Sequence, residues 1–279
     1  MIAGSLLVWA AVVAVAVHAL RSRRDSHTPR TANLLIIGGG VVLPAVVLIA
    51  LLGYGMPVLT AVIEPAPATA LRVDITAKQW WWRVRYHVDG EDIETANEIR
   101  LPVGQRIAIR LTSLDVIHSF WVPSLAGKMD MFPGRVTQLA IEPTRVGTFR
   151  GACAEYCGES HALMRFVVVV TEEHEFRTWL AQQARPAEPA AAPDEFIANG
   201  CAACHTVRGR SSNGRIGPDL THVGSRLGLG GGVLPNDAES LAAWIARVDE
   251  IKPGVHMPAF RALPADRVHA LAAYLKSLQ

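Results

Sequence analysis

Two long apolar segments near the start of the chain constrain its fold more than any other feature. Residues 2–20 and 34–56 contain no Asp, Glu, Lys or Arg, and each approaches the ~20 residues that a helix needs to cross a bilayer. They predict a hairpin of two transmembrane helices within residues 1–63. The glycines at 38–40 and Pro44 would break a helix in water but are better tolerated in a membrane.

The segment between the two spans predicts how the hairpin is oriented. It carries Arg21, Arg23, Arg24 and Arg30, and short loops rich in Arg and Lys stay in the cytoplasm. Residues 21–30 are therefore predicted to be cytoplasmic. Everything after residue 60 then lies on the periplasmic or extracellular face of a bacterial inner membrane. The chain is thus predicted to be a multi-pass protein of that membrane.

Each span has an alternative interpretation. The first resembles a cleaved signal peptide in length, but its arginines follow the apolar run instead of preceding it, which is the wrong order for a signal peptide. The second could be a buried core helix, although its length and lack of polar residues argue against this. We therefore expect both to remain as membrane anchors.

From Leu71 to Thr171 the pattern changes to short strand-like runs. They recur about every ten residues and are separated by Gly, Pro or charged turns, which is typical of an antiparallel sandwich or barrel. Residues 172–184 read as a closing helix. The Pro/Ala-rich stretch at 184–193 reads as an extended linker.

The last segment, 194–279, begins and ends with helical patterns and contains a further helix near 237–250. Gly200 and Tyr274 are predicted to be points of helix packing. The net charge of the chain is only +2, so no nucleic-acid partner is expected.

The stretch "GACAEYCGESHALM" at 151–164 points to a copper site. Cys153, Cys157, His161 and Met164 offer thiolate, imidazole and thioether ligands, which together suit copper better than zinc. The cysteine spacing permits two thiolates on one loop to share metal ions. His118, at the end of an apolar run, is the best candidate for a further ligand from another strand. A disulfide between the two cysteines is the alternative.

The stretch "CAACH" at 201–205 is the attachment motif of a c-type heme. Cys201 and Cys204 would bond the porphyrin covalently, and His205 would bind the iron. Within this segment only Met257 offers a thioether for the opposite axial position, and its neighbour His256 is a rival ligand. A zinc ribbon would need a second pair of ligands, and no cysteine remains.

The motifs "DVIHSFWVPS", "KMDMFPGR" and "GACAEYCGESHALM" make residues 1–183 resemble subunit II of the heme–copper cytochrome c oxidases. The resemblance implies a cupredoxin-type domain with a dinuclear copper A centre. In that family the two cysteines bridge the coppers, one histidine binds each copper, and a thioether and a backbone carbonyl are weak ligands. The positions that match are His118, Cys153, Glu155 through its carbonyl, Cys157, His161 and Met164.

The resemblance also implies two roles beside the copper centre. The carboxylate of Glu155 would face a magnesium ion shared with subunit I. Trp80, in "AKQWWWRVRY", falls where electrons enter the family's copper centre, although it could instead be a packing residue. Trp81 stands where the family usually has Tyr, a departure that touches no ligand. In a strand, Trp81 and Trp82 would point to opposite faces.

Residues 194–279 resemble the small class I cytochromes c. The resemblance agrees with Met257 as the axial ligand in a loop before the last helix. It also implies that the carbonyl of Pro218, in "IGPDL", accepts a hydrogen bond from His205. Several acidic residues could attract a basic electron donor: Glu91, Asp92, Glu94, Glu98 and Asp115. Solvated loop charge is the simpler interpretation for most of them, with the exception of Asp115, which immediately precedes the ligand loop.

Together these features predict a membrane-anchored protein of several domains. They are a transmembrane hairpin (1–63), a cupredoxin-like β-sandwich with copper A (64–183), a linker (184–193) and an all-α cytochrome c domain (194–279). The expected function is that of subunit II of a caa-type cytochrome c oxidase, which receives electrons from a cytochrome c or a quinol:cytochrome c reductase and works with subunit I and the other oxidase subunits. The rivals are a copper A nitric oxide reductase subunit and a stand-alone anchored carrier. A copper-storage module and a quinol-oxidase subunit fit the motifs less well.

Overall fold

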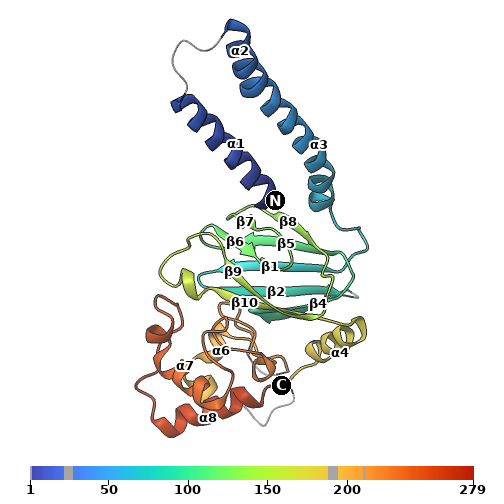
Figure 1. The fold of residues 1–279 in the computed structure, drawn as a ribbon. Coiled ribbons are helices and arrows are strands. Elements are labelled where there is room, and N and C mark those ends of the chain that lie inside the picture. The colour runs from blue at the N-terminus through green and yellow to red at the C-terminus, as the bar shows by residue number, and fades with distance from the viewer. Residues whose placement is uncertain (1, 22–27, 89, 188–193, 210–211) are drawn as a thin grey trace. The chain divides into compact units, whose positions relative to one another are not determined.

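The computed structural model describes residues 2–21, 28–88, 90–187, 194–209 and 212–279. The backbone divides into two compact units, residues 1–62 and 63–279 (Figure 1).

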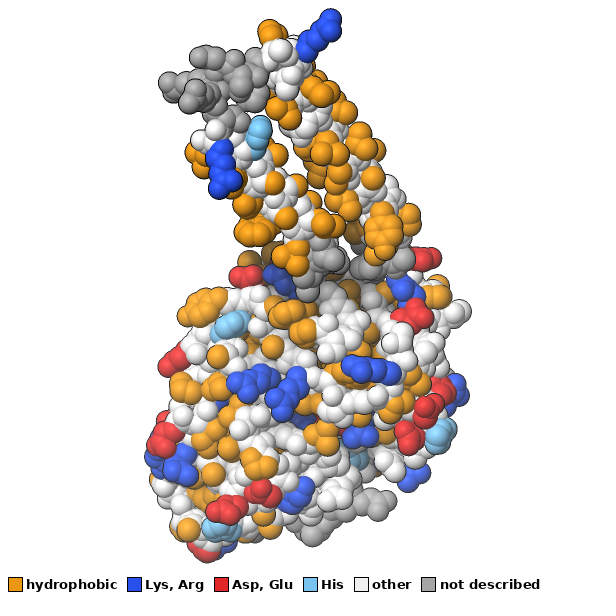
Figure 2. Space-filling model, viewed as in Figure 1, with side chains coloured by type: hydrophobic (Ala, Val, Ile, Leu, Met, Phe, Trp, Pro, Cys, Tyr) orange, Lys and Arg blue, Asp and Glu red, His pale blue; other side chains and the backbone are white. Residues whose placement is uncertain are grey.

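The first unit is the predicted pair of long apolar helices. α1 spans Ile2–Arg21, and a second helical stretch runs through α2 (Pro29–Asn33), η1 (Leu34–Val42) and α3 (Leu43–Ile63). No residue of either candidate membrane span is buried, and hydrophobic side chains cover both helices (Figure 2). The exposure of so much apolar surface is what a bilayer requires.

The second helical stretch is longer than the predicted 34–56. It begins at Pro29 because the Thr28 hydroxyl accepts a hydrogen bond from the Thr31 N–H and caps the helix, with proline at its first position. Just before Pro44 the helix widens into a π-helix, in which the Leu43 N–H bonds to the Gly38 carbonyl. Local widening of this kind lets a helix pass a proline without ending.

The second unit contains a β-sandwich of two five-stranded sheets. One sheet has the order β3-β2-β1-β5-β8 and the other the order β4-β10-β9-β6-β7. The strands are β1 (Arg72–Lys78), β2 (Trp81–Val88), β3 (Glu91–Ala96), β4 (Glu98–Pro102), β5 (Ile107–Ser113), β6 (His118–Trp121), β7 (Met129–Met131), β8 (Thr137–Ile141), β9 (Gly147–Cys153) and β10 (Arg165–Thr171).

The sandwich was predicted, but its strands are not all antiparallel. β1 pairs with β5, and β4 with β10, in parallel. The cause is a change of sheet between β3 and β4, where Asn97 alone connects the two strands. Asn97 has φ 61°, a left-handed conformation that asparagine tolerates better than most residues. β3 and β7 were not predicted, because neither has a clear apolar alternation.

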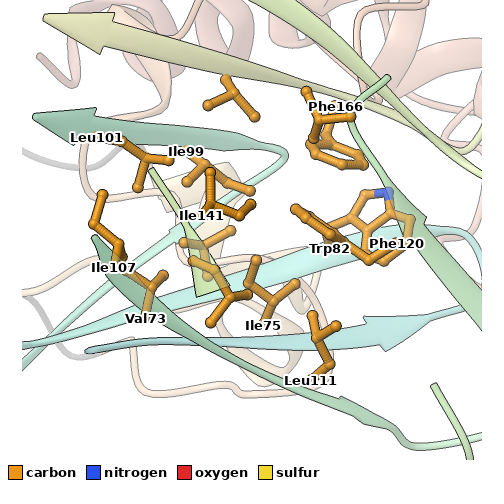
Figure 3. Packing of buried hydrophobic residues seen from close by; sticks show 14 of the residues in the cluster. Val73, Ile75, Trp82, Ile99, Leu101, Ile107, Leu111, Phe120, Ile141 and Phe166 are labelled. Carbon is orange, nitrogen blue, oxygen red and sulfur yellow. The ribbon is translucent and has the colours of Figure 1, made fainter. Parts of the chain in front are cut away.

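The core of the sandwich lies between the two sheets (Figure 3). Alternate residues of β2 point inward, with Trp82 fully buried while Trp81 stays partly exposed. The Trp82 ring centroid lies 5.0 Å from that of Phe166 and 5.9 Å from that of Phe120. These rings fill the end of the core that adjoins the loop between β9 and β10, and they pack beneath that loop.

Short helices form the rest of the second unit. They are α4 (Glu173–Ala184), α5 (Asp194–Ala198), α6 (Cys201–Cys204), α7 (Ala238–Ile251) and α8 (Ala265–Ser277), with 3-10 turns at His161–Leu163 and Val223–Ser225. Tyr274 packs against Phe196, with ring centroids 5.7 Å apart. Gly200 was wrongly predicted as a packing point, because no atom lies within 4 Å of the Cβ position that it lacks.

The predicted linker at 184–193 is partly anchored. Ala184 belongs to α4, and Ala187 is buried in the helical core. Arg208 donates hydrogen bonds to the carbonyls of Gln183 and Ala184. The remainder of the predicted linker, 188–193, lies outside the described residues.

Candidate copper and heme sites

The candidate copper ligands gather at the β9–β10 hairpin. Cys153 is the last residue of β9, and Met164 comes directly before β10. The Cys153 N–H donates to the Met164 carbonyl (3.0 Å) and closes the base of the loop. This bond joins the two ends of the loop between the strands, and the loop contains Cys157 and His161.

Strand register brings His118 to the same place. Phe120 of β6 lies opposite Cys153 of β9, and paired residues in a sheet point to the same face. His118 is two residues before Phe120, so it shares that face. The imidazole of His118 is completely buried.

Six ligand groups then meet within contact distance. Ligand atoms of His118, Cys153 and Cys157 all lie within 4.8 Å of one another. Nδ1 of His118 is 3.8 Å from the Cys153 sulfur, and Nδ1 of His161 is 3.4 Å from the Cys157 sulfur. The Met164 sulfur is 3.7 Å from that of Cys157. The Glu155 carbonyl lies 3.2 Å from the Cys153 sulfur.

The protonation of the two thiols favours a bound cation. The pKa of Cys153 lies below its ordinary value, chiefly because it is stabilised by a hydrogen bond with Cys157. The same contact, together with burial, raises the pKa of Cys157. Without a metal, the protein thus stabilises the thiolate of Cys153 and opposes ionisation of the neighbouring Cys157 thiol. Metal cations would supply the positive charge that lets both ionise, so this donor set fits soft copper ions.

Asp115 orients His118. One carboxylate oxygen of Asp115 lies 2.8 Å from Nε2 of His118, which leaves Nδ1 facing the sulfur of Cys153. Burial alone would raise the pKa of Asp115, but hydrogen bonds from His118 and from the backbone N–H groups of Gln79 and Val116 outweigh it and lower the pKa. Burial would likewise lower the pKa of His118, and its bonds to Cys153 and Asp115 reverse the sign.

Trp80 joins this site through the backbone of the ligand loop. Its indole N–H donates to the Cys157 carbonyl (2.9 Å), which also accepts a bond from the Gln79 side chain (2.8 Å). Trp80 is only 6% exposed. Gly158 has φ +109°, and a Cβ there would lie 3.0 Å from the indole, so the loop needs glycine at this position.

The candidate heme motif lies on a separate short helix. Cys201 is the first residue of α6 and Cys204 is its last, and neither forms a disulfide. Two free thiols followed by a histidine fit covalent attachment of heme.

His205 is placed to bind an iron ion. Its Nδ1 lies 2.8 Å from the Pro218 carbonyl, which leaves Nε2 for the metal. Burial lowers the pKa of His205, so the imidazole is kept neutral, as a metal ligand must be. A Cβ on Gly217 would lie 2.5 Å from the imidazole ring. Met257 is half-buried in the loop between α7 and α8, and its role as axial ligand stays a prediction.

Other predicted residues have mixed outcomes. Three of the acidic residues form ion pairs: Asp92 and Glu94 pair with Arg85, and Glu98 is buried against Arg100. Attraction of a basic electron donor by the acidic residues stays a prediction. The magnesium role of the Glu155 carboxylate stays a prediction. Gln79, Gly158 and Gly217 were missed as supporting residues, because each depends on contacts between distant segments.

Comparison with known proteins agrees with this arrangement. The family "Cytochrome C oxidase subunit II, periplasmic domain" matches residues 87–171, and the family "Cytochrome c" matches residues 190–279. Cytochrome c oxidase subunit 2 of Alkalihalophilus pseudofirmus is 32% identical over 99% of this chain and 83% of its own length. That of Bacillus subtilis is 33% identical over 75% of this chain and 63% of its own length.

A solved structure also matches, that of the periplasmic domain of cytochrome oxidase subunit II from Bradyrhizobium japonicum. It has 31% sequence identity and a TM-score of 0.40, and it covers 43% of this chain and 96% of that domain.

A two-sheet β-domain with a thiolate–imidazole site, joined to a region with a c-type heme motif, defines an electron-transfer protein with two redox centres. The chain belongs to the cytochrome c oxidase subunit II family, in the form that carries a fused C-terminal cytochrome c domain. It is a membrane-anchored subunit of a heme–copper oxidase complex, and its task is electron transfer within the oxidase.

Proposed function

We propose that this chain takes electrons from an external donor at heme c and passes them through dinuclear copper A to the heme–copper centre of subunit I, where O2 is reduced to water and protons are pumped. The observation that carries the proposal is that five ligand groups of the β9–β10 hairpin meet the imidazole of His118 from β6. That hairpin belongs to the same compact unit as the heme motif.

The residues divide this task between them. Cys153 and Cys157 would bridge two coppers, and His118 and His161 would bind one copper each. Met164 and the Glu155 carbonyl would be the weak copper ligands. At the heme, His205 and Met257 would bind the iron. When bound, the copper pair shares one electron between two ions, and this keeps changes of geometry small. The protein must hold the ligands rigidly and keep water away from them. The burial of His118 and the hydrogen bond between Cys153 and Met164 at the base of the loop serve these two ends.

The proposed domain plan follows the sequence prediction. Residues 1–63 anchor the chain in the inner membrane with residues 21–30 in the cytoplasm. Residues 64–183 hold copper, and residues 194–279 hold heme on the periplasmic or extracellular face. The donor is a cytochrome c or a quinol:cytochrome c reductase, and the Glu155 carboxylate reaches a magnesium ion shared with subunit I. The relatives' names favour an oxidase over a nitric oxide reductase.

Metal analysis of the purified oxidase tests the proposal. Replacing Cys153 and Cys157 together with Ser should remove both subunit II coppers and leave the covalent heme. The reciprocal control, Cys201→Ser with Cys204→Ser, should remove the heme c and leave the copper. Zinc in the first site, or one copper instead of two, would contradict the dinuclear site. Purification of the chain without a catalytic subunit would favour a stand-alone carrier.

A further inference from the structure

The loop that carries Met257 rests directly on the copper ligand loop. The carbonyl of Pro253 accepts a hydrogen bond from the buried Ser160 hydroxyl (2.6 Å), which is next to His161. Val255 packs against the hydrophobic core of the β-sandwich. A stretch of three residues in the helical region, 253–255, is thus held by the β-sandwich immediately before the predicted iron ligand.

Gly254, in the middle of this stretch, lies against Trp80. A Cβ on Gly254 would be 2.7 Å from Cη2 of the indole and 2.9 Å from Cζ3, whereas ordinary contact begins at 3.4 Å. It would also lie 2.7 Å from Oε2 of Glu159, but that atom ends an exposed, flexible side chain that can move aside. The backbone of Gly254 also has φ +77°, which favours glycine. Cη2 and Cζ3 are at the opposite end of the indole from the N–H that bonds the Cys157 carbonyl. Trp80 therefore spans the distance between the Met257 loop and a copper ligand.

A second set of contacts joins the β-sandwich to the segment that packs on His205. Lys78 donates to the Ile216 carbonyl (2.9 Å), and Arg83 donates to the Arg215 carbonyl (2.5 Å). This segment continues into Gly217, which packs on His205. The loops that adjoin the two predicted axial ligands thus both contact the β-sandwich near Trp80.

These contacts share a chemical character that matters for function. The hydrogen bonds run from side chains to backbone carbonyls, and none of them is an ion pair. Hydrogen bonds of this kind are little affected by dissolved salt, unlike the attraction between separate charged surfaces. The contacts between these segments are therefore packing and hydrogen bonds to backbone carbonyls.

We propose that Gly254 is a positioning residue for electron transfer, which lets the Met257 loop seat directly on Trp80 and so sets the path from the cytochrome region to the Cys157 loop. This inference rests on the proposed function. It adds that transfer uses the Met257 side of the heme region, and that its rate depends on the absence of a side chain at position 254.

The test compares Gly254→Ala with Gly232→Ala in the complete oxidase. Gly232 has φ +80°, close to that of Gly254, but no atom lies within 4 Å of its missing Cβ, so it controls for backbone strain. Gly254→Ala must move the loop from Trp80 by several tenths of an ångström. We expect flash-induced heme-to-copper transfer to slow on the order of tenfold or more, because small misplacements of reacting groups have large effects on rate.

Three other measurements accompany the rate. Heme and copper contents and the heme potential should stay at wild-type values, because no ligand changes. Backbone amides of residues 253–257 should exchange hydrogen faster in Gly254→Ala than in Gly232→Ala, which reports seating of the loop without any turnover. The wild-type rate should be unchanged between low and moderate ionic strength.

A double-variant cycle tests the contact itself. Trp80→Phe removes both indole atoms that a Cβ at position 254 would meet, and leaves only Glu159 Oε2, the end of an exposed side chain that can move aside. Gly254→Ala should therefore slow transfer less in that background than in the wild type. Equal slowing in both backgrounds would overturn the inference, as would a wild-type rate in Gly254→Ala or equal slowing by Gly232→Ala. Failure of the proposed function is distinct: the wild-type heme would then pass no electron to copper at all.

Discussion

Replacing Asp115 with Asn should weaken copper binding without removing any copper ligand. One carboxylate oxygen of Asp115 accepts from His118 and the Val116 N–H, and the other accepts from the Gln79 N–H (2.7 Å). An amide keeps the shape but replaces one oxygen with a donor. In either orientation, an NH2 group then faces an existing N–H, so at least one of these bonds is lost.

The size of the effect follows from what the lost bond does. Loss of a partner that orients a metal-binding histidine typically costs 10–100-fold in affinity, which is ~1.4–2.7 kcal/mol. The upper part of this range applies if the amide turns its NH2 group toward His118. The lower part applies if only the Gln79 N–H loses its acceptor. His118 also packs edge-on against Trp82, with ring centroids 6.3 Å apart, and this contact limits how far the imidazole can turn.

Competition with a copper chelator measures the effect on the complete chain. Asp74→Asn is the matched control, because Asp74 also bonds a histidine and a further donor, Arg72, but on the exposed face of the other sheet. We expect weaker copper binding in Asp115→Asn and wild-type binding in Asp74→Asn. Wild-type affinity in Asp115→Asn would refute the reasoning and would mean that packing alone orients His118.

Three further predictions follow from the two regions. Met257→Ala should lower the heme potential, because thioether ligation raises it; redox titration of the heme band would show this. Trp82→Ala should cost ~3–5 kcal/mol in the β-sandwich, measured by denaturation. Burial would raise the pKa of Asp74, but hydrogen bonds from Arg72 and His87 outweigh it and lower the pKa below 3.8. Asp74 therefore stabilises the fold above that pH, and the melting-temperature gap to Asp74→Asn should close as the pH falls below it.

Much of the architecture could be predicted because its causes are local. Uncharged runs of membrane length and period-two alternation in β2 both act between neighbours in the sequence. Alternation predicted that Trp81 and Trp82 point to opposite faces, and the structure agrees, with Trp82 as the inward one. The parallel strand pairs were missed because they depend on the change of sheet at Asn97, which decides pairing between strands that are distant in the sequence.

The candidate sites divide in the same way. The ligands on one loop, Cys153 to Met164, are brought together by a single hairpin whose ends pair at Cys153 and Met164. His118 could be predicted from its motif, but its orientation by Asp115 required the structure. No local pattern predicts that the carbonyl of Pro253 meets Ser160, because the two residues are 93 positions apart in the sequence.

Trp80 is where the constraints from both regions meet. Gly158 of the copper loop and Gly254 of the Met257 loop both lie against it: a Cβ at position 158 would lie 3.0 Å from Cζ2 of the indole, and a Cβ at position 254 would lie 2.7 Å from Cη2. A tryptophan that only fills a core would be surrounded by side chains. Here two backbones approach one indole, and one of them also accepts the hydrogen bond of the indole N–H at Cys157. The close approach of two backbone segments to one indole costs conformational entropy, because glycine is required at both positions. A connecting role of Trp80 between the two redox regions would account for that cost.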